Sequence, residues 1–117
     1  MSGMLQIADG KLWGGFAGPL FRWFFGQLAM DSDDPRVLAL CRELADDPFD
    51  YGGDITSWDS AALASLAATV ERFRDRLRDH GAELLDPGEK VEPWVRIADE
   101  LLAALRADPR LRGLGPG

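Results

Sequence analysis

The fold class is decided by the stretch at residues 63–77, LASLAATVERFRDRL. Its apolar residues recur at spacings of 3, 4, 3 and 4, at Leu63, Leu66, Val70, Phe73 and Leu77. This is the period of one face of an α-helix, and acidic and basic residues share the other faces, as they do on solvated helices. The pattern therefore predicts a long helix with a single buried seam, which we place over residues 57–80.

Both ends of this helix carry boundary signals. Thr56 or Ser57 is expected to cap the N-terminus, with Asp59 completing a capping box near the positive end of the helix dipole. At the other end Gly81 follows His80 and is expected to stop the helix in the left-handed conformation that suits glycine. We interpret His80 as a capping residue at a helix C-terminus rather than as a catalytic base.

Three further helices are predicted over residues 19–30, 35–45 and 93–107. Each begins at a proline in the first turn, where the missing N–H costs nothing, at Pro19, Pro35 and Pro93. Asp33 or Asp34 is expected to cap the second of these helices. The first is apolar on nearly every face, so we expect it to lie at the centre of the bundle.

The segments outside these helices are predicted to be a hairpin, a loop and a tail. Two short apolar runs flank Asp9-Gly10, a pair that favours a type I′ turn, so a short β-hairpin is expected over residues 5–13. Residues 46–54 read as a loop, and residues 110–117, rich in glycine, read as a flexible tail. The 117 residues therefore predict a mainly α protein: a single-domain bundle of about four helices over residues 1–109, with a short N-terminal hairpin.

The composition excludes several classes of partner. With 13 basic and 20 acidic residues the net charge is -7, which opposes binding to nucleic acid and to anionic membrane surfaces. The longest apolar stretch, residues 14–30, is interrupted by Pro19, Arg22 and Gly26, so no membrane-spanning helix is expected. A single cysteine and no leader pattern favour a cytoplasmic location, and the richness in arginine and alanine is typical of a bacterial source.

The negative charge is concentrated in one segment. Residues 31–59 hold nine acidic and two basic residues, a net charge of -7, so the rest of the chain is neutral overall. Aromatic residues are interleaved with these acids, and aromatic anchors in a field of one sign favour rapid, salt-sensitive binding to a cationic protein. The candidate partner-binding residues are Asp46, Asp47, Phe49, Asp50, Tyr51, Asp54 and Trp58.

No residue pattern points to catalysis, a cofactor or a metal. Cys41 lies at helical spacing among leucines and is expected in the core. With His80 as the only histidine, neither a hydrolytic triad nor a zinc site can be assembled. The acidic runs at 31–34 and 46–54 lack the spacing of a calcium loop, and no phosphate-binding loop is present. We therefore expect a protein that is not an enzyme.

In size, charge and simplicity the chain is similar to small acidic bacterial immunity proteins, which neutralise basic toxins. The resemblance implies a non-enzymatic protein-binding module whose acidic surface, residues 31–59, docks on a basic protein partner. One alternative is a helical homo-oligomer or assembly subunit, with the seam or the helix at 19–30 completed by another copy.

The second alternative is a small-ligand binder or enzyme with an aromatic pocket lined by Trp13, Trp23, Trp58 and Trp94. Aromatic residues also cluster near the N-terminus, at Trp13, Phe16, Phe21, Trp23, Phe24 and Phe25. We interpret this cluster as core, while an exposed aromatic face that meets a partner is the other reading.

Overall fold

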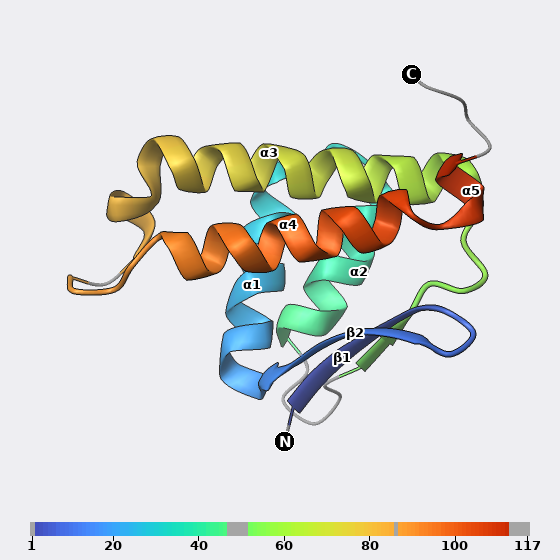
Figure 1. Cartoon of the computed structure of the whole chain (residues 1–117), viewed down its shortest axis with the longest axis horizontal. Coiled ribbons are helices and arrows are strands. Elements are labelled where there is room, and N and C mark those ends of the chain that lie inside the picture. The colour runs from blue at the N-terminus through green and yellow to red at the C-terminus, as the bar shows by residue number, and fades with distance from the viewer. Residues whose placement is uncertain (1, 47–51, 86, 113–117) are drawn as a thin grey trace.

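The seam of residues 63–77 lies on the longest helix of the computed structural model, which describes residues 2–46, 52–85 and 87–112 (Figure 1). In chain order the elements are β1 (Ser2–Ala8), β2 (Lys11–Ala17), α1 (Gly18–Asp31), α2 (Pro35–Asp46), β3 (Gly52–Asp54), α3 (Ser60–Leu84), α4 (Glu92–Arg106) and α5 (Pro109–Arg112). The mainly α fold class with an N-terminal hairpin is therefore confirmed.

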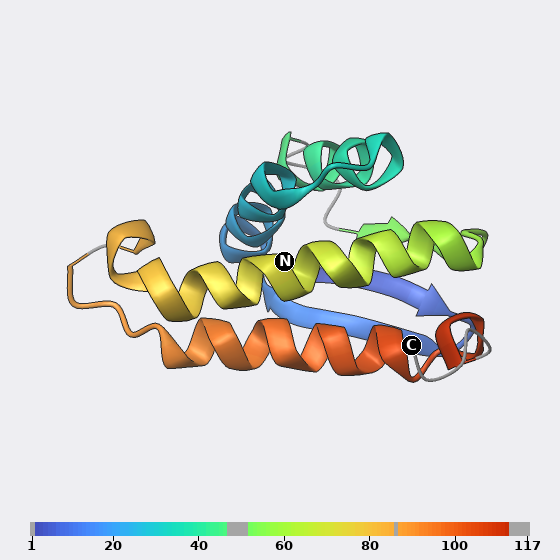
Figure 2. The ribbon, with the colours of Figure 1, turned by 90° about the horizontal axis from the view of Figure 1, so that it is seen from above.

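The four longer helices form two pairs, α3 with α4 and α1 with α2. Helices α3 and α4 run side by side along the length of the molecule, and α1 and α2 pack together on the other flank of α3 (Figures 1 and 2). The small sheet lies beneath the α3–α4 pair and beside α1 and α2 (Figure 1). None of the helices in the described ranges combines the length and apolar character needed to cross a bilayer.

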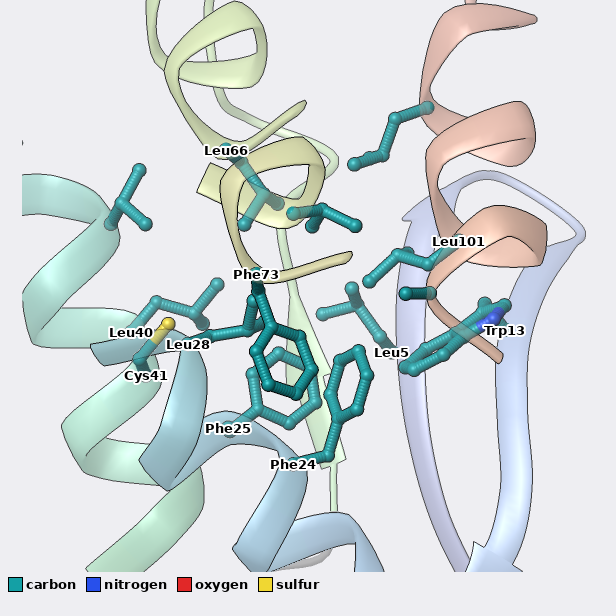
Figure 3. Packing of buried hydrophobic residues seen from close by; sticks show 14 of the residues in the cluster. Leu5, Trp13, Phe24, Phe25, Leu28, Leu40, Cys41, Leu66, Phe73 and Leu101 are labelled. Carbon is teal, nitrogen blue, oxygen red and sulfur yellow. The ribbon is translucent and has the colours of Figure 1, made fainter. Parts of the chain in front are cut away.

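The core is built on the predicted seam and on the aromatic cluster. All five seam residues are fully buried, and the ring of Phe73 meets that of Phe24 at a centroid distance of 5.2 Å (Figure 3). Trp13, from the sheet, packs on Phe24 at 5.4 Å. The seam is thus covered within one chain and does not need a second copy. Among the members whose burial the structure describes, Trp13, Phe21, Phe24 and Phe25 are buried and Trp23 is partly buried, while the burial of Phe16 lies outside that description.

The N-terminal end of α3 differs from the expectation. Asp59, and neither Thr56 nor Ser57, is the capping residue, because its side chain accepts a hydrogen bond from the Ala62 N–H at 2.8 Å. At the start of α2 the expected cap is confirmed, since the Asp34 carboxylate accepts the Arg36 N–H at 2.8 Å.

The C-terminal end of α3 also differs. The helix kinks at His80, whose φ and ψ are -135° and 18°, and then continues to Leu84, so Gly81 does not end it in a left-handed conformation. Val91 packs directly on Gly81, and a Cβ there would lie 2.6 Å from Val91 Cγ2. Glycine is therefore required for close approach rather than for a turn.

The hairpin is longer than residues 5–13, and its turn is not type I′. Gly10 has a φ of 74°, but no non-glycine residue in the described ranges has a positive φ, so Asp9 does not adopt the conformation that a type I′ turn needs. The strand register pairs Leu5 with Trp13 and Gln6 with Leu12. Leu5 and Trp13 consequently face the core, while Gln6 and Leu12 lie on the outer face of the sheet.

A third strand occupies part of the segment expected to be a loop. Strand β3 runs parallel to β1, with Gly53 opposite Leu5 and Asp54 opposite Gln6, and gives the strand order β2-β1-β3. A side chain at Gly53 would crowd Leu5 and Leu44 at 3.1 and 3.2 Å. The glycine therefore lets this short strand lie close to the core.

The expected flexible tail begins with ordered structure. Residues 110–112 belong to α5, and the Arg110 guanidinium donates to the carbonyl oxygens of Ile55, Trp58 and Ile7 at 2.8, 2.8 and 2.7 Å. These bonds join α5 to the loop before α3 and to the sheet. Residues 113–117 of the expected tail lie outside the described residues.

Candidate partner-binding site

Several acidic residues of the 31–59 segment are engaged by the fold itself. The Asp31 carboxylate pairs with Arg76 at 2.7 Å, and both side chains are largely buried. Asp34 and Asp59 cap α2 and α3, and hydrogen bonds from Arg36 lower the pKa of Asp34 below its ordinary value. These carboxylates therefore stabilise helices and helix contacts within the fold.

Three other acidic residues, Glu43, Asp46 and Asp54, are exposed, and none has an ion-pair partner among the described residues. Asp54 accepts the Thr56 N–H at 2.8 Å, and hydrogen bonds from Thr56 lower the pKa of its carboxyl. That carboxylate is therefore held in one orientation and ionised at neutral pH.

Two of these carboxylates line a groove of about 500 Å³ where the outer face of the sheet meets α2. We call it the acidic groove and define it by Met4, Gln6, Leu12, Leu40, Glu43, Gly53 and Asp54. Strand alternation explains its floor, because the residues next to buried Leu5 must face outward. Leu12 is 59% exposed there, which is unusual for a large apolar side chain on this protein.

The sequence-predicted site residues fall in different places. Asp54 lines the acidic groove, and Asp46 lies three residues after Glu43 on α2 without lining it. Trp58 is partly buried against the core, and its carbonyl oxygen accepts a hydrogen bond from Arg110. The remaining four predicted residues lie outside the described residues: Asp47, Phe49, Asp50 and Tyr51.

Sequence reasoning missed most of the groove. Leu12 and Met4 each alternate with a buried neighbour, Trp13 and Leu5, and that alternation is a signal for outward-facing apolar residues. Glu43 carried no such signal, because it was one of nine acids in its segment. The lining comes from three separate regions of the sequence: the hairpin, α2 and β3. The pairing of β3 with β1 is what places Asp54 beside the hairpin.

The single cysteine and the single histidine differ in exposure. Cys41 is fully buried, and burial raises the pKa of its thiol to about 12, so it remains protonated and inert. His80 is exposed, and its Nδ1 lies 3.9 Å from Glu83. No group of three or more metal-binding side chains gathers within the described ranges.

The four tryptophans do not line one pocket. Trp23 and Trp94 contact each other at a centroid distance of 4.5 Å and border a hollow of about 250 Å³. Trp13 packs into the core, and Trp58 lies in the loop before α3, so neither borders that hollow. This hollow therefore brings together two of the four tryptophans expected to line one pocket.

A larger hollow, of about 690 Å³, lies between the C-terminal part of α3 and the start of α4. Its charged residues are of both signs: Arg78, Asp79, Glu83, Glu92, Arg96 and Asp99. Arg78 is already paired with Asp99 at 3.6 Å. Four acidic and two basic residues therefore line this hollow, so its charges are of both signs.

The chain is thus a mainly α domain with a small mixed sheet and an acidic groove. Neither a family model nor a curated protein matches its sequence. Among solved structures it is similar to one chain of a complex between the CdiA-CT toxin from Burkholderia pseudomallei E479 and its cognate CdiI immunity protein. The TM-score is 0.70 at 18% identity, over 93% of this chain and 98% of the other. At that identity the likeness shows a shared fold.

Proposed function

We propose that this chain is a non-enzymatic protein-binding module, immunity-protein-like in character, that docks on a basic protein partner. The observation that carries the proposal is the acidic groove, in which exposed carboxylates of Glu43 and Asp54 stand beside exposed Leu12. The likeness in fold to a chain of a toxin–immunity complex supports it, because a protein partner belongs to that structure.

Electrostatics favour a cationic partner. The net charge of -7 arises within residues 31–59, and part of it stands unpaired at the acidic groove. A low-dielectric cleft lined by charges of one sign concentrates its field and speeds the approach of the opposite charge. Apolar contact with Leu12 and Met4 then slows dissociation, because the contact removes exposed apolar surface from water.

Within a toxin–immunity pair, the inhibitor role fits this chain better than the toxin role. Its single cysteine is buried and protonated, and its single histidine is exposed with Glu83 as its ionic neighbour among the described residues. An acidic protein with an apolar-floored groove has the surface that an inhibitor of a basic toxin needs.

Co-expression tests this proposal. The chain would be produced together with each protein encoded by the genes that flank its own, and the growth of the host would be recorded. We expect the partner alone to arrest growth, the chain to restore it, and the two proteins to elute together. The affinity of the purified pair should fall at least about tenfold between low and high salt, because exposed charges are screened. Growth that is not restored would contradict the proposal.

A further inference from the structure

The acidic groove is lined by both apolar and acidic side chains. Met4, Leu12 and Leu40 supply apolar surface from three elements, whereas Glu43 and Asp54 supply carboxylates from α2 and β3. A partner group with an apolar stem and a positively charged tip complements both kinds of lining. Lysine and arginine side chains have this build, because an aliphatic stem carries their charged head.

No residue lining the acidic groove is basic, so its carboxylates are not neutralised from within. The α3–α4 hollow is the contrast: it is larger, yet Arg78 and Arg96 lie among its acids. The charged side chains of the acidic groove are thus all negative, whereas those of the α3–α4 hollow are of both signs.

Arginine suits the acidic groove better than lysine. Its guanidinium is planar, carries five donors and is more weakly hydrated than an ammonium group, so it loses less on leaving water and can bond two carboxylates at once. The Asp54 carboxylate is already oriented, because its Oδ1 accepts the Thr56 N–H at 2.8 Å.

We propose that the acidic groove receives one arginine side chain of the protein partner, with the stem on Leu12, Met4 and Leu40 and the guanidinium between Glu43 and Asp54. This inference rests on the proposed function, because it names the group of the basic partner that anchors the complex. It also makes a statement about the isolated chain that needs no partner protein.

A blocked Ala-Arg-Ala tripeptide is the probe, and its citrulline counterpart is the control, since citrulline has nearly the same shape without the charge. Amide shifts of the isotope-labelled full-length chain would be recorded during titration with each peptide at matched ionic strength. We expect saturating shifts confined to the region of Leu12, Leu40, Glu43 and Gly53, at least about fivefold larger with arginine than with citrulline. Equal shifts with both peptides, or shifts spread over other acidic surfaces, would overturn the inference.

A matched pair of variants separates this site from general acidity. Glu43→Gln with Asp54→Asn removes the carboxylates and keeps the side-chain shapes. Glu89→Gln with Glu100→Gln changes the net charge equally at exposed positions outside the acidic groove. Arginine-specific shifts should disappear in the first variant and persist in the second, and persistence in both would overturn the inference.

The two proposals can fail separately. If the chain protects its host and binds a basic protein while the arginine peptide does not enter the acidic groove, the arginine assignment is wrong and the proposed function stands. If the peptide enters the acidic groove and the chain neither binds the basic protein nor restores growth, the arginine assignment stands and the proposed function is wrong.

Discussion

At the scale of single residues, Arg110 joins α5 to the sheet and to the loop before α3. Its guanidinium donates to three backbone carbonyls and pairs with Asp108 at 2.8 Å, where the Asp108 side chain is only 3% exposed. Arg110→Ala leaves that carboxylate buried without a cation, so we expect a loss of about 2–4 kcal/mol in the free energy of unfolding. Urea denaturation measures it, with exposed Arg112→Ala as a control that should change stability by less than about 0.5 kcal/mol. Equal effects of the two substitutions would contradict this account.

The same pair predicts a pH dependence. The hydrogen bond from Arg110 holds the pKa of Asp108 below its ordinary value. A carboxyl whose pKa is lower in the folded than in the unfolded state contributes stability above its unfolded value of about 3.9, and that contribution is lost as the pH falls through the folded value. We therefore expect the stability difference between the native chain and Asp108→Asn to be largest above about pH 5 and to shrink in acid. Thermal denaturation across this range measures it, and a difference independent of pH would contradict the assignment.

At the scale of elements, the close approach of α4 to the kink in α3 depends on Gly81. A Cβ at this position would lie 2.6 and 2.8 Å from the two Val91 methyl groups. We expect Gly81→Ala to destabilise the chain by about 1–3 kcal/mol, and Val91→Ala in the same chain to recover part of that loss. Calorimetric unfolding of the single and double variants gives the coupling, which should be absent if the two residues do not touch.

Gly26 on α1 is the matched contrast to Gly81. The nearest atom to a Cβ there is the Cβ of Ala45 at 3.8 Å, an ordinary contact. Gly26→Ala should therefore stabilise the chain by about 0.5–1 kcal/mol, because alanine loses less backbone freedom on folding. The same calorimetric measurement tests it, and a destabilised variant would show that α1 and α2 pack more tightly than this distance indicates.

Local signals account for the elements that could be predicted. The seam of α3 and the first-turn prolines of α2 and α4 act within one or two helical turns, so the sequence alone locates these helices. Strand β3, with the sequence Gly52-Gly53-Asp54, has no strand pattern of its own and forms only because β1 offers a free edge. The Gly81 contact likewise depends on Val91, which belongs to the segment leading into α4.

At the scale of the whole molecule, the candidate site likewise has a part that local sequence predicts and a part that depends on tertiary contacts. The sequence locates the negative charge in residues 31–59, but it does not separate acids used by the fold, such as Asp31 and Asp59, from those left at the surface. That separation depends on which arginines reach them from α3 and α2. The acidic groove is a product of tertiary structure, because β1, β2, β3 and α2 each contribute to its lining.

Calorimetric titration of the chain with its basic partner, using the two charge-matched variants, tests the central claim most directly. The account predicts that Glu43→Gln with Asp54→Asn weakens the complex at least about tenfold, or about 1.4 kcal/mol, while Glu89→Gln with Glu100→Gln changes the affinity by less than about twofold. Equal weakening by both variants, or none by the first, would contradict the claim that the acidic groove is the docking site.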